Sequence, residues 1–484
     1  MKKSLCGITA RENNNNKKDE RKMIMKKALA FLVAAMMLVA CVGCNNTTTE
    51  PTPAPTVDEP TTTPETTPEA QNPETPAATG SVYYLNFKPE ADAGWQALAE
   101  SYTAQFGIPV KVVTAASGTY ADTLNAQMGK EGAPTLFQCG NAQGLADWND
   151  YMLDLTDTAV YNEMTTHEYD LSDETGAVKA IAYCYESYGI IVNTALLKQA
   201  GYELTDITDF ASLKAVADDI HARSAELGFD AFSSAGLDPS SSWRFSGHLV
   251  SVPLFYEFRD DGVTEQPASI NGTYIDNFRQ IWDLYITDSA ANPTSLSTST
   301  SDESEAEFGQ GKAVFYQNGS WEFANLVLRE DLGFMMNADD LAMIPIYCGV
   351  EGEEKAGLCN GTENCWAVNS QASEEDIQAT LDFLYWVVTS DEGTQMLADN
   401  IGAVPFKSAK VPANSFCASA QEYAFAGNYN VAWAFNYTPN MDSWRAGVVT
   451  ALTAYTADPS DANWEAVKTA VVEGWAIEYA AQNG

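Results

Sequence analysis

Between residues 81 and 138, short apolar segments alternate with amphipathic ones, and this pattern restricts the possible folds more than any other feature of the sequence. The apolar segments predict buried strands at Ser81–Phe87, Pro109–Thr114 and Ala133–Gln138. The segments between them predict helices, one with an apolar face running from Trp95 to Phe106 and one over Tyr120–Lys130. Strands that alternate with helices indicate βαβ units, a parallel sheet, and ligand sites at the C-terminal ends of the strands.

The chain carries a strong negative charge: 26 Lys and Arg face 66 Asp and Glu, a formal net charge of −40 over 484 residues. Such a surface repels phosphate groups, which argues against nucleic-acid binding. Only His167, His221 and His248 are present, far apart in sequence, which argues against a His-based metal site. No P-loop, zinc-protease or nucleophile-elbow motif occurs, and the nine cysteines have no regular spacing. We therefore expect no cofactor and no bound metal.

Residues 23–44 (MIMKKALAFLVAAMMLVACVGC) have the pattern of an export signal. Lys26 and Lys27 precede the apolar run Ala28–Ala40, which is too short for a typical membrane span. No other apolar run of 18 residues is present. The residues before Met23 are polar and Asn-rich, which leaves open a later true start of the chain.

The end of this signal, Leu38-Val39-Ala40-Cys41, resembles a bacterial lipobox. The resemblance implies a signal peptide over residues 1–40 and a lipid on Cys41, so that the protein is anchored to a membrane without spanning it. Cys44 is a weaker candidate for the lipid, and an ordinary secretory signal with incidental cysteines is the alternative.

Residues 41–80 are predicted to be a disordered tether. After the cysteines the segment is rich in Thr, Pro and Glu and has no aromatic residue, so it cannot bury enough apolar surface to fold. Its prolines keep it extended. We expect it to hold a folded body at a distance from the bilayer.

The stretch Phe308–Trp321 (FGQGKAVFYQNGSW) carries the first family resemblance. It predicts a helix end, a turn at Gly309–Gly311, a buried strand over Lys312–Tyr316 and a second turn at Asn318–Gly319. Taken alone, Trp321 suits a core better than a ligand site. The whole stretch resembles the bacterial extracellular solute-binding proteins of family 1, the carbohydrate-binding group that serves ABC importers. The resemblance implies that Trp321 lies at the edge of a sugar cleft.

Residues 180–197 (AIAYCYESYGIIVNTALL) carry the second resemblance, at the point where members of this family cross between lobes. The resemblance implies that Glu186 and Tyr188 face the sugar. Alternation along a strand would put both on one face, and a carboxylate accepts charge-assisted hydrogen bonds from hydroxyl groups. A partly buried Glu186 satisfied by backbone donors is the alternative.

Further ligand-binding positions follow from the same resemblance. Lys88 and Glu90, in the loop after the first strand, are candidates for polar contacts, although both suit an exposed loop equally well. Asn141 follows the third strand and could offer its amide. The remaining candidates, at positions where family members line or approach the cleft, are Trp243, Arg244, Glu363, Trp366 and Trp444. The sequence leaves open whether Cys359 and Cys365 form a disulfide.

The resemblance covers residues 81–484 and implies an α/β fold of the two-lobed, periplasmic-binding-protein-like class (type II). We expect each lobe to contain a mainly parallel sheet flanked by helices, with crossing hinge strands between the lobes. The expected lobes are residues 81–180 plus 360–402 and residues 181–359 plus 403–484.

The implied function is that of an exported, lipid-anchored, monomeric binding protein at the outer face of the cell membrane. It would close by hinge motion around an oligosaccharide and deliver it to an ABC permease whose ATPase is a separate chain. Several aromatic candidates favour an oligosaccharide over a monosaccharide. A lipid-anchored glycoside hydrolase is the main alternative, but no motif selects a pair of catalytic carboxylates, so we expect no enzyme activity. Two further alternatives are a surface protein that senses a sugar, and a protein of the same fold that binds a polyamine or a metal.

Overall fold

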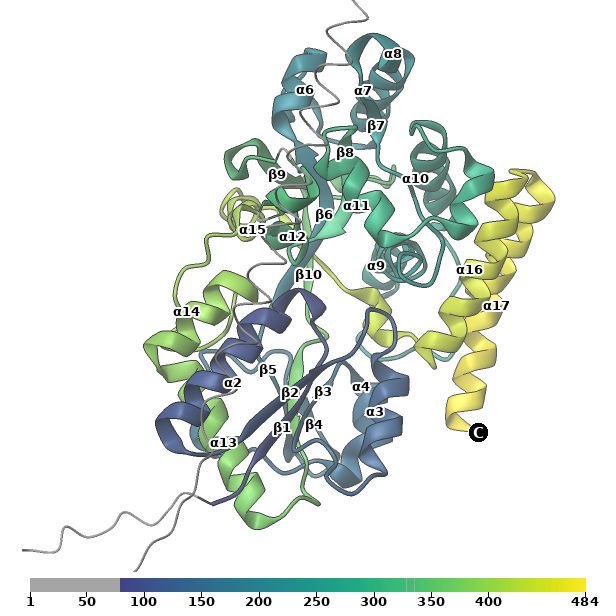
Figure 1. The fold of residues 1–484 in the computed structure, drawn as a ribbon. Helices are drawn as coiled ribbons and strands as arrows, with labels where there is room; N and C mark the ends of the chain where they lie inside the picture. The colour runs from purple at the N-terminus through teal and green to yellow at the C-terminus, as the bar shows by residue number, and fades with distance from the viewer. Residues whose placement is uncertain (1–78, 328, 335) are drawn as a thin grey trace, which may run out of the picture. The chain divides into compact units, whose positions relative to one another are not determined.

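The computed structural model describes residues 79–327, 329–334 and 336–484 (Figure 1). The predicted signal peptide, the lipidation site at Cys41 and residues 41–78 of the tether lie outside these ranges. Among the helices that the structure describes, none is long and apolar enough to cross a membrane.

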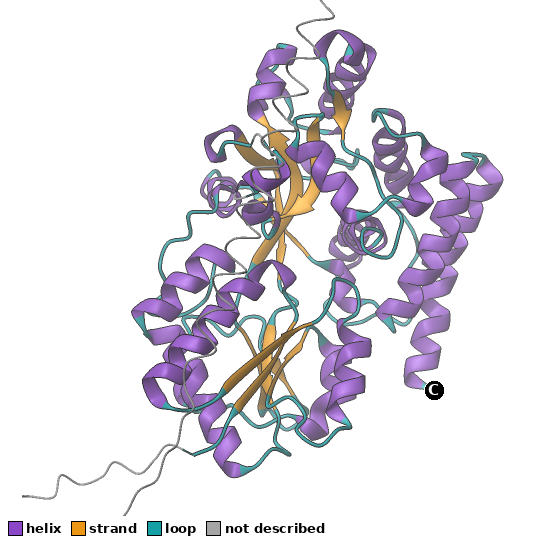
Figure 2. Cartoon of the chain, in the orientation of Figure 1, coloured by secondary structure: helices purple, strands orange, loops and turns teal. Residues whose placement is uncertain are grey.

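The first sheet has six strands in the order β2-β1-β3-β11-β5-β4 (Figures 1 and 2). Its strands are β1 (Val82–Asn86), β2 (Val110–Thr114), β3 (Leu136–Cys139), β4 (Leu171–Ser172), β5 (Val178–Ala182) and β11 (Cys365–Val368). β1 pairs in parallel with both β2 and β3, as the βαβ pattern predicts. β11 is antiparallel to β3 and β5, and β4 is antiparallel to β5.

Helices flank this sheet (Figure 2). They are α2 (Asp92–Phe106), α3 (Tyr120–Met128), α4 (Ala142–Trp148), α5 (Ala159–Asn162), α13 (Glu374–Thr389) and α14 (Asp391–Asn400), with the 3-10 turns η1 (Pro89–Ala91) and η2 (Asn149–Tyr151). The predicted helices α2 and α3 are both present. The apolar face of α2 buries Trp95 and Tyr102, whereas Phe106, at the last position of the helix, is 46% exposed.

The second sheet also has six strands, in the order β12-β10-β6-β8-β7 with β9 paired to β6. They are β6 (Glu186–Asn193), β7 (Asp230–Phe232), β8 (Ala313–Gly319), β9 (Leu341–Ile344), β10 (Ala356–Gly361) and β12 (Tyr429–Ala432). β6 and β8 are buried along their whole length. β8 contains most of the predicted strand at Lys312–Tyr316 and continues to Gly319, so the predicted second turn forms the end of this strand.

The helices of the second lobe are α6 (Thr194–Ala200), α7 (Phe210–Ala222), α8 (Ser224–Leu227), the π-helix η4 (Arg244–Leu249), α9 (Val250–Asp261), α10 (Ile275–Thr287), α11 (Ser301–Gly309), α12 (Glu322–Val327), α15 (Ser415–Phe425), α16 (Met441–Ala457) and α17 (Asp461–Asn483). Short 3-10 turns are η3 (Leu204–Asp206), η5 (Pro293–Thr298), η6 (Glu330–Leu332), η7 (Ala338–Asp340), η8 (Glu353–Lys355) and η9 (Ala434–Tyr437). α16 and α17 pack along each other (Figure 1).

The α/β class is confirmed, but the expectation of mainly parallel sheets is wrong. In the second sheet β6 is antiparallel to β8, β9 and β10, and only the pairs β7–β8 and β10–β12 among the described strands are parallel. The cause is the route of the chain: β6 follows β5 after residues 183–185, and β11 follows β10 after residues 362–364. A strand that follows such a crossing starts at the edge of the sheet where the strands of the βαβ units end. It therefore runs in the opposite direction and pairs with its neighbours in antiparallel fashion.

Buried Glu353 should stabilise the second lobe. Its Oε1 accepts from the backbone N–H of Phe210 at 2.7 Å, and its Oε2 accepts from those of Cys348 at 2.7 Å and Gly349 at 2.8 Å. In Glu353→Gln an amide NH₂ would face backbone donors, so we expect the free energy of unfolding, measured by urea titration, to fall by about 3 kcal/mol. The neighbouring exposed variant Glu354→Gln is the control and should unfold like the wild type. Equal stability of the two variants would contradict this role.

Candidate functional site

Backbone hydrogen bonds tie together the segments that pass between the two sheets. These segments are residues 183–185, residues 362–364 and, after α14, residues 401–405. The N–H of Tyr183 donates to the carbonyl of Asn364 at 2.9 Å. The N–H of Tyr185 donates to the carbonyl of Ala403, also at 2.9 Å. The first crossing segment is thus bonded to the other two, and the side chains beside it lie at the junction of the sheets.

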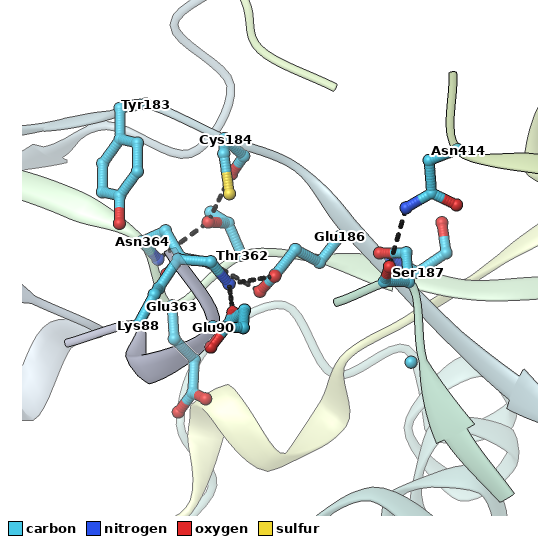
Figure 3. Close-up of polar contacts among 12 residues, drawn as sticks. Lys88, Glu90, Tyr183, Cys184, Glu186, Ser187, Thr362, Glu363, Asn364 and Asn414 are labelled. Carbon is cyan, nitrogen blue, oxygen red and sulfur yellow. Dashed lines mark hydrogen bonds and ion pairs between the residues drawn. The ribbon is translucent and has the colours of Figure 1, made fainter. Parts of the chain in front are cut away.

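A buried polar centre lies at this junction and consists of Lys88, Glu90, Glu186 and Asn364 (Figure 3). The ammonium of Lys88 contacts Glu186 Oε1 at 2.5 Å and Glu90 Oε1 at 2.7 Å. Asn364 Nδ2 donates to the other oxygen, Glu186 Oε2, at 2.6 Å. Because Lys88 follows β1, Asn364 precedes β11 and Glu186 begins β6, this centre joins the two sheets.

Charge pairing keeps Lys88 ionised. Burial alone would lower the pKa of Lys88, which is 3% exposed, but Glu186 and Glu90 outweigh burial and hold this pKa well above its usual value. The loop is also fixed locally, since Asn86 donates from Nδ2 to the Lys88 carbonyl at 2.8 Å and accepts at Oδ1 from the Lys88 N–H at 3.1 Å. Hydrogen bonds to its backbone and ion pairs to its side chain therefore both fix the position of Lys88.

An aromatic group lies in the second lobe and consists of Tyr188, Trp243, His248, Trp321 and Trp433. His248 stacks on Tyr188 with ring centroids 4.2 Å apart and an interplanar angle of 4°. Its centroid is 5.1 Å from that of Trp243 and 5.5 Å from that of Trp321. Tyr188, His248 and Trp433 are buried, whereas Trp243 and Trp321 are only half-buried. Trp243 and Trp321 are therefore the members of the group whose rings keep solvent-accessible surface that a ligand could contact.

Two glycines create the space for these rings. A Cβ atom on Gly319 would lie 2.2 Å from the ring of Trp321, and one on Gly361 would lie 2.6 Å from the ring of Trp433. Each ring thus lies directly over a glycine at the end of a strand. Any side chain at Gly319 or Gly361 would displace the ring above it.

Arg244, at the start of η4, holds the framework of the second lobe. It is 1% exposed, and its guanidinium donates to the carbonyl of Gln317 at 3.0 Å, to Ser241 Oγ at 2.8 Å and to Ser304 Oγ at 3.1 Å. Since these acceptors are neutral and lie within the same lobe, Arg244 links η4 to β8 and α11.

Glu322 is a buried carboxyl beside this arginine. It begins α12, which contacts η1 of the other lobe, and its Oε2 has no hydrogen-bond partner among the described residues. Burial, followed by the charge of Glu305, raises its pKa to about 8, against the opposing effect of Arg244. Near neutral pH this carboxyl is therefore largely protonated and can donate as well as accept.

Two further charged side chains lie near the polar centre, Glu363 in the second crossing segment and Arg445 in α16. Burial raises the pKa of Glu363 to about 7, while Arg445 acts to lower it. Burial lowers the pKa of Arg445, and Glu363 is the first group that opposes this. The two groups therefore interact electrostatically.

The family described as bacterial extracellular solute-binding protein matches residues 97–424 of this chain. The chain belongs to this family. No curated protein sequence matches this solute-binding protein significantly.

Solved structures show the same fold at low sequence identity. The solute-binding protein RafE in complex with raffinose gives a TM-score of 0.66 at 15% identity, covering 83% of this chain and 100% of that chain. The GacH receptor of Streptomyces glaucescens gives 0.57 at 18% identity, covering 83% and 99%. The mannobiose complex of a binding protein from Bifidobacterium animalis subsp. lactis gives 0.59 at 15% identity, covering 83% and 95%. These likenesses show the two-lobed, periplasmic-binding-protein-like fold.

The solute-binding protein brings together most of the positions that the sequence singles out. The polar centre contains Lys88, Glu90 and Glu186, and the aromatic group contains Tyr188, Trp243 and Trp321. Glu363 lies next to Asn364 of the polar centre. Tyr188 is fully buried beneath His248, so it supports the other rings and has no free face of its own.

Trp366 and Trp444 lie in cores, and we do not retain them as ligand contacts. Trp366 stacks on Tyr183 with ring centroids 4.2 Å apart, and it is buried because β11 lies inside its sheet with helices on both faces. Trp444 is on the face of α16 that packs against α17, and its Nε1 donates to the carbonyl of Val471 at 3.0 Å. Neither ring has a face open to a ligand.

Asn141 and Arg244 have framework contacts in the structure. Asn141 caps α4, because its Oδ1 accepts from the N–H of Gly144 at 3.0 Å. Arg244 donates to acceptors of the second lobe, while its Nε has no partner among the described residues. Cys359 and Cys365, which the sequence left open as a disulfide, are free thiols in different sheets.

Sequence reasoning missed several groups at the junction, namely Asn364, His248, Glu322, Trp433 and Arg445. Asn364 and Arg445 are direct neighbours of two candidates, Glu363 and Trp444, so the correct segments were identified but not the correct side chains. His248 is buried among aromatic rings, which no local sequence pattern indicates. Within the described residues, no group of three or more His, Cys, Asp or Glu side chains could hold a metal ion.

The raised pKa of Glu322 predicts a pH-dependent cost to stability. The pKa rises from 4.5 to about 8 on folding, so the folded state loses stability as pH increases between these values. We expect Glu322→Gln to be more stable than the wild type by roughly 3 kcal/mol at pH 8. At pH 5, where the carboxyl is protonated, the two proteins should have nearly the same melting temperature. Melting curves from pH 5 to pH 8 check this, and a difference that does not change with pH would contradict it.

Proposed function

We propose that this solute-binding protein captures an oligosaccharide between its two lobes and delivers it to an ABC permease. The observation that carries this proposal is the pairing of a buried polar centre with half-buried tryptophans at the junction of the sheets. A sugar has polar edges and apolar C–H faces, so its site needs planar hydrogen-bonding groups and flat aromatic surfaces together.

The proposed contacts divide by chemistry. Trp243 and Trp321, whose ring centroids are 5.9 Å apart, would pack against sugar rings. Lys88, Glu90 and Glu186 would bind hydroxyl groups with the oxygens and N–H groups that remain accessible. Rings at more than one position favour an oligosaccharide over a monosaccharide.

The related structures support the ligand class. These structures include complexes with raffinose and mannobiose, and with acarbose and an acarbose homologue for GacH. These are carbohydrates or carbohydrate-like compounds of more than one ring. Because the identities are 15–18%, the particular sugar bound here must come from a binding experiment.

The proposal extends to the location of the protein. The export signal over residues 1–40 and a lipid on Cys41 would anchor it to the outer face of the cell membrane. The Thr-, Pro- and Glu-rich residues up to 80 would give the two lobes reach from the bilayer to a permease. Hinge motion about the crossing segments would close the lobes on the ligand.

A thermal-shift and calorimetry screen against raffinose, mannobiose, maltotriose and xylotriose tests the ligand class. We expect at least one to bind with a dissociation constant in the micromolar range, about −8 kcal/mol. The bound sugar should be recovered unchanged by chromatography after long incubation. Cleavage products would favour the glycoside hydrolase alternative, and a lack of binding to all four would contradict the oligosaccharide assignment.

Trp243→Ala should weaken binding of the tightest sugar at least tenfold, because it removes half of the aromatic surface that is proposed to pack on the ligand. Its melting temperature should change little, since the ring is only half-buried. Tyr385→Ala removes an exposed aromatic ring on α13 and is the matched control, with no expected change in affinity. A large loss of stability in Trp243→Ala would assign this ring to the core instead.

A further inference from the structure

Glu363 has a fixed backbone and a free carboxylate. Its carbonyl accepts from Gln138 Nε2 at 2.9 Å, and a Cβ atom on Gly140 would approach this carbonyl to 3.3 Å. Among the described residues, its side chain makes no hydrogen bond or ion pair. Figure 3 shows the carboxylate extending away from the contact between Lys88 and Glu186. Its neighbours therefore position Glu363 without using its charge.

Arg445 is a partly buried guanidinium with few partners. Its Nε donates to Ser246 Oγ at 3.4 Å, a long hydrogen bond, and its NH1 lies 3.8 Å from Asp442 Oδ1. The side chain is 25% exposed. A Cβ atom on Gly247 would lie 3.7 Å from Nε, so Arg445 packs against η4 at Ser246 and Gly247. Most of its five donors thus have no protein acceptor among the described residues.

The two groups influence each other without touching. No ion pair of 4.0 Å or less joins Glu363 to Arg445 among the described residues, although each is the leading charged influence on the pKa of the other. The residue before Glu363 also lies against the turn that precedes α16, because Asn436 Nδ2 of η9 donates to the Thr362 carbonyl at 3.5 Å. A carboxylate with unused acceptors and a guanidinium with unused donors therefore lie in the same region, more than 4.0 Å apart.

We propose that Glu363 and Arg445 form a clasp for two neighbouring hydroxyl groups of one sugar ring. Glu363 accepts a hydrogen bond from one hydroxyl, and Arg445 donates to the oxygens of both through its planar fork. This inference rests on the proposed function and adds to it a requirement for adjacent hydroxyls on one sugar ring of the ligand. The ligand would also screen the two charges from water and so strengthen their attraction.

The clasp makes binding depend on pH. An ionised Glu363 accepts a stronger, charge-assisted hydrogen bond than the neutral acid does. In the empty site burial raises its pKa to about 7, so affinity should rise as pH increases through this value. The titratable and charged groups that face Glu363 are Arg445, Glu186, Asp442, Lys88, Cys365 and Tyr188. Burial and the like charges Glu186 and Asp442 raise the pKa, whereas Arg445 and Lys88 lower it.

A double-mutant cycle tests the clasp, using calorimetry with the tightest sugar from the four-sugar screen. Glu363→Gln and Arg445→Gln should each weaken binding about tenfold or more. The double variant should bind only slightly worse than either single variant, because both remove the same clasp. Arg259→Gln and Glu473→Gln change exposed residues elsewhere and should bind like the wild type. Melting temperatures of all variants identify any loss that comes from misfolding, and in that case Arg445→Lys, which keeps the charge without the fork, replaces Arg445→Gln.

The pH profile gives an independent readout. Wild-type affinity should rise about tenfold from pH 6 to pH 8, as expected for one group with a pKa of about 7. In Glu363→Gln the profile should be flat, whereas in Glu322→Gln the rise should persist.

The possible outcomes separate the two proposals. Non-additive losses together with a pH dependence that disappears in Glu363→Gln support the clasp. If a sugar binds but both single variants keep wild-type affinity, or their losses are fully additive, the clasp is overturned while the proposed function stands. If none of the four sugars binds the wild type, both proposals fail.

Discussion

The contact of Lys88 with Glu186 is the interaction on which the rest of the site depends. It joins residues 98 positions apart in sequence, one at the end of β1 in the first sheet and one at the start of β6 in the second. A buried ammonium alone would be costly, so Lys88 requires Glu186 and Glu90 to remain ionised, while Asn364 donates to the other oxygen of Glu186. Replacing one partner would leave an uncompensated charge at the junction of the lobes.

The aromatic group depends on a different constraint: the positions beneath two of its rings must be glycines, which have no side chain. The rings of Trp321 and Trp433 lie over Gly319 and Gly361, at the ends of β8 and β10, the two strands on either side of β6. Both strands pair with β6, so the glycines, the rings and Glu186 share one edge of the second sheet. The position of the rings is therefore set by backbone pairing and not by their own contacts alone.

Local sequence patterns predicted the elements of the fold better than their pairing. The strands and helices from β1 to β3 were predicted from apolar periodicity, and the segments around Glu186 and Trp321 from the family resemblance. The sequence did not predict that β6 and β11 are each antiparallel to their neighbours in their own sheets, because this depends on where the chain enters each sheet and no local pattern records that.

The same limit applies to the site. Trp366 and Trp243 look equivalent in sequence, and only the layers packed around them decide which is buried. Arg445 was missed because its role depends on a partner, Glu363, that lies in a distant segment.

The backbone hydrogen bonds among the crossing segments have a consequence for the timing of recognition. A rotation of one lobe displaces each atom in proportion to its distance from the axis, and an axis through residues 183–185 and 362–364 passes beside Glu186 and Asn364. In the proposed hinge motion these two side chains would therefore stay almost stationary, while groups farther from the axis would move through a longer arc. An arriving solute would meet an already assembled charged anchor first and the flat rings second, so that recognition proceeds from the pivot outwards.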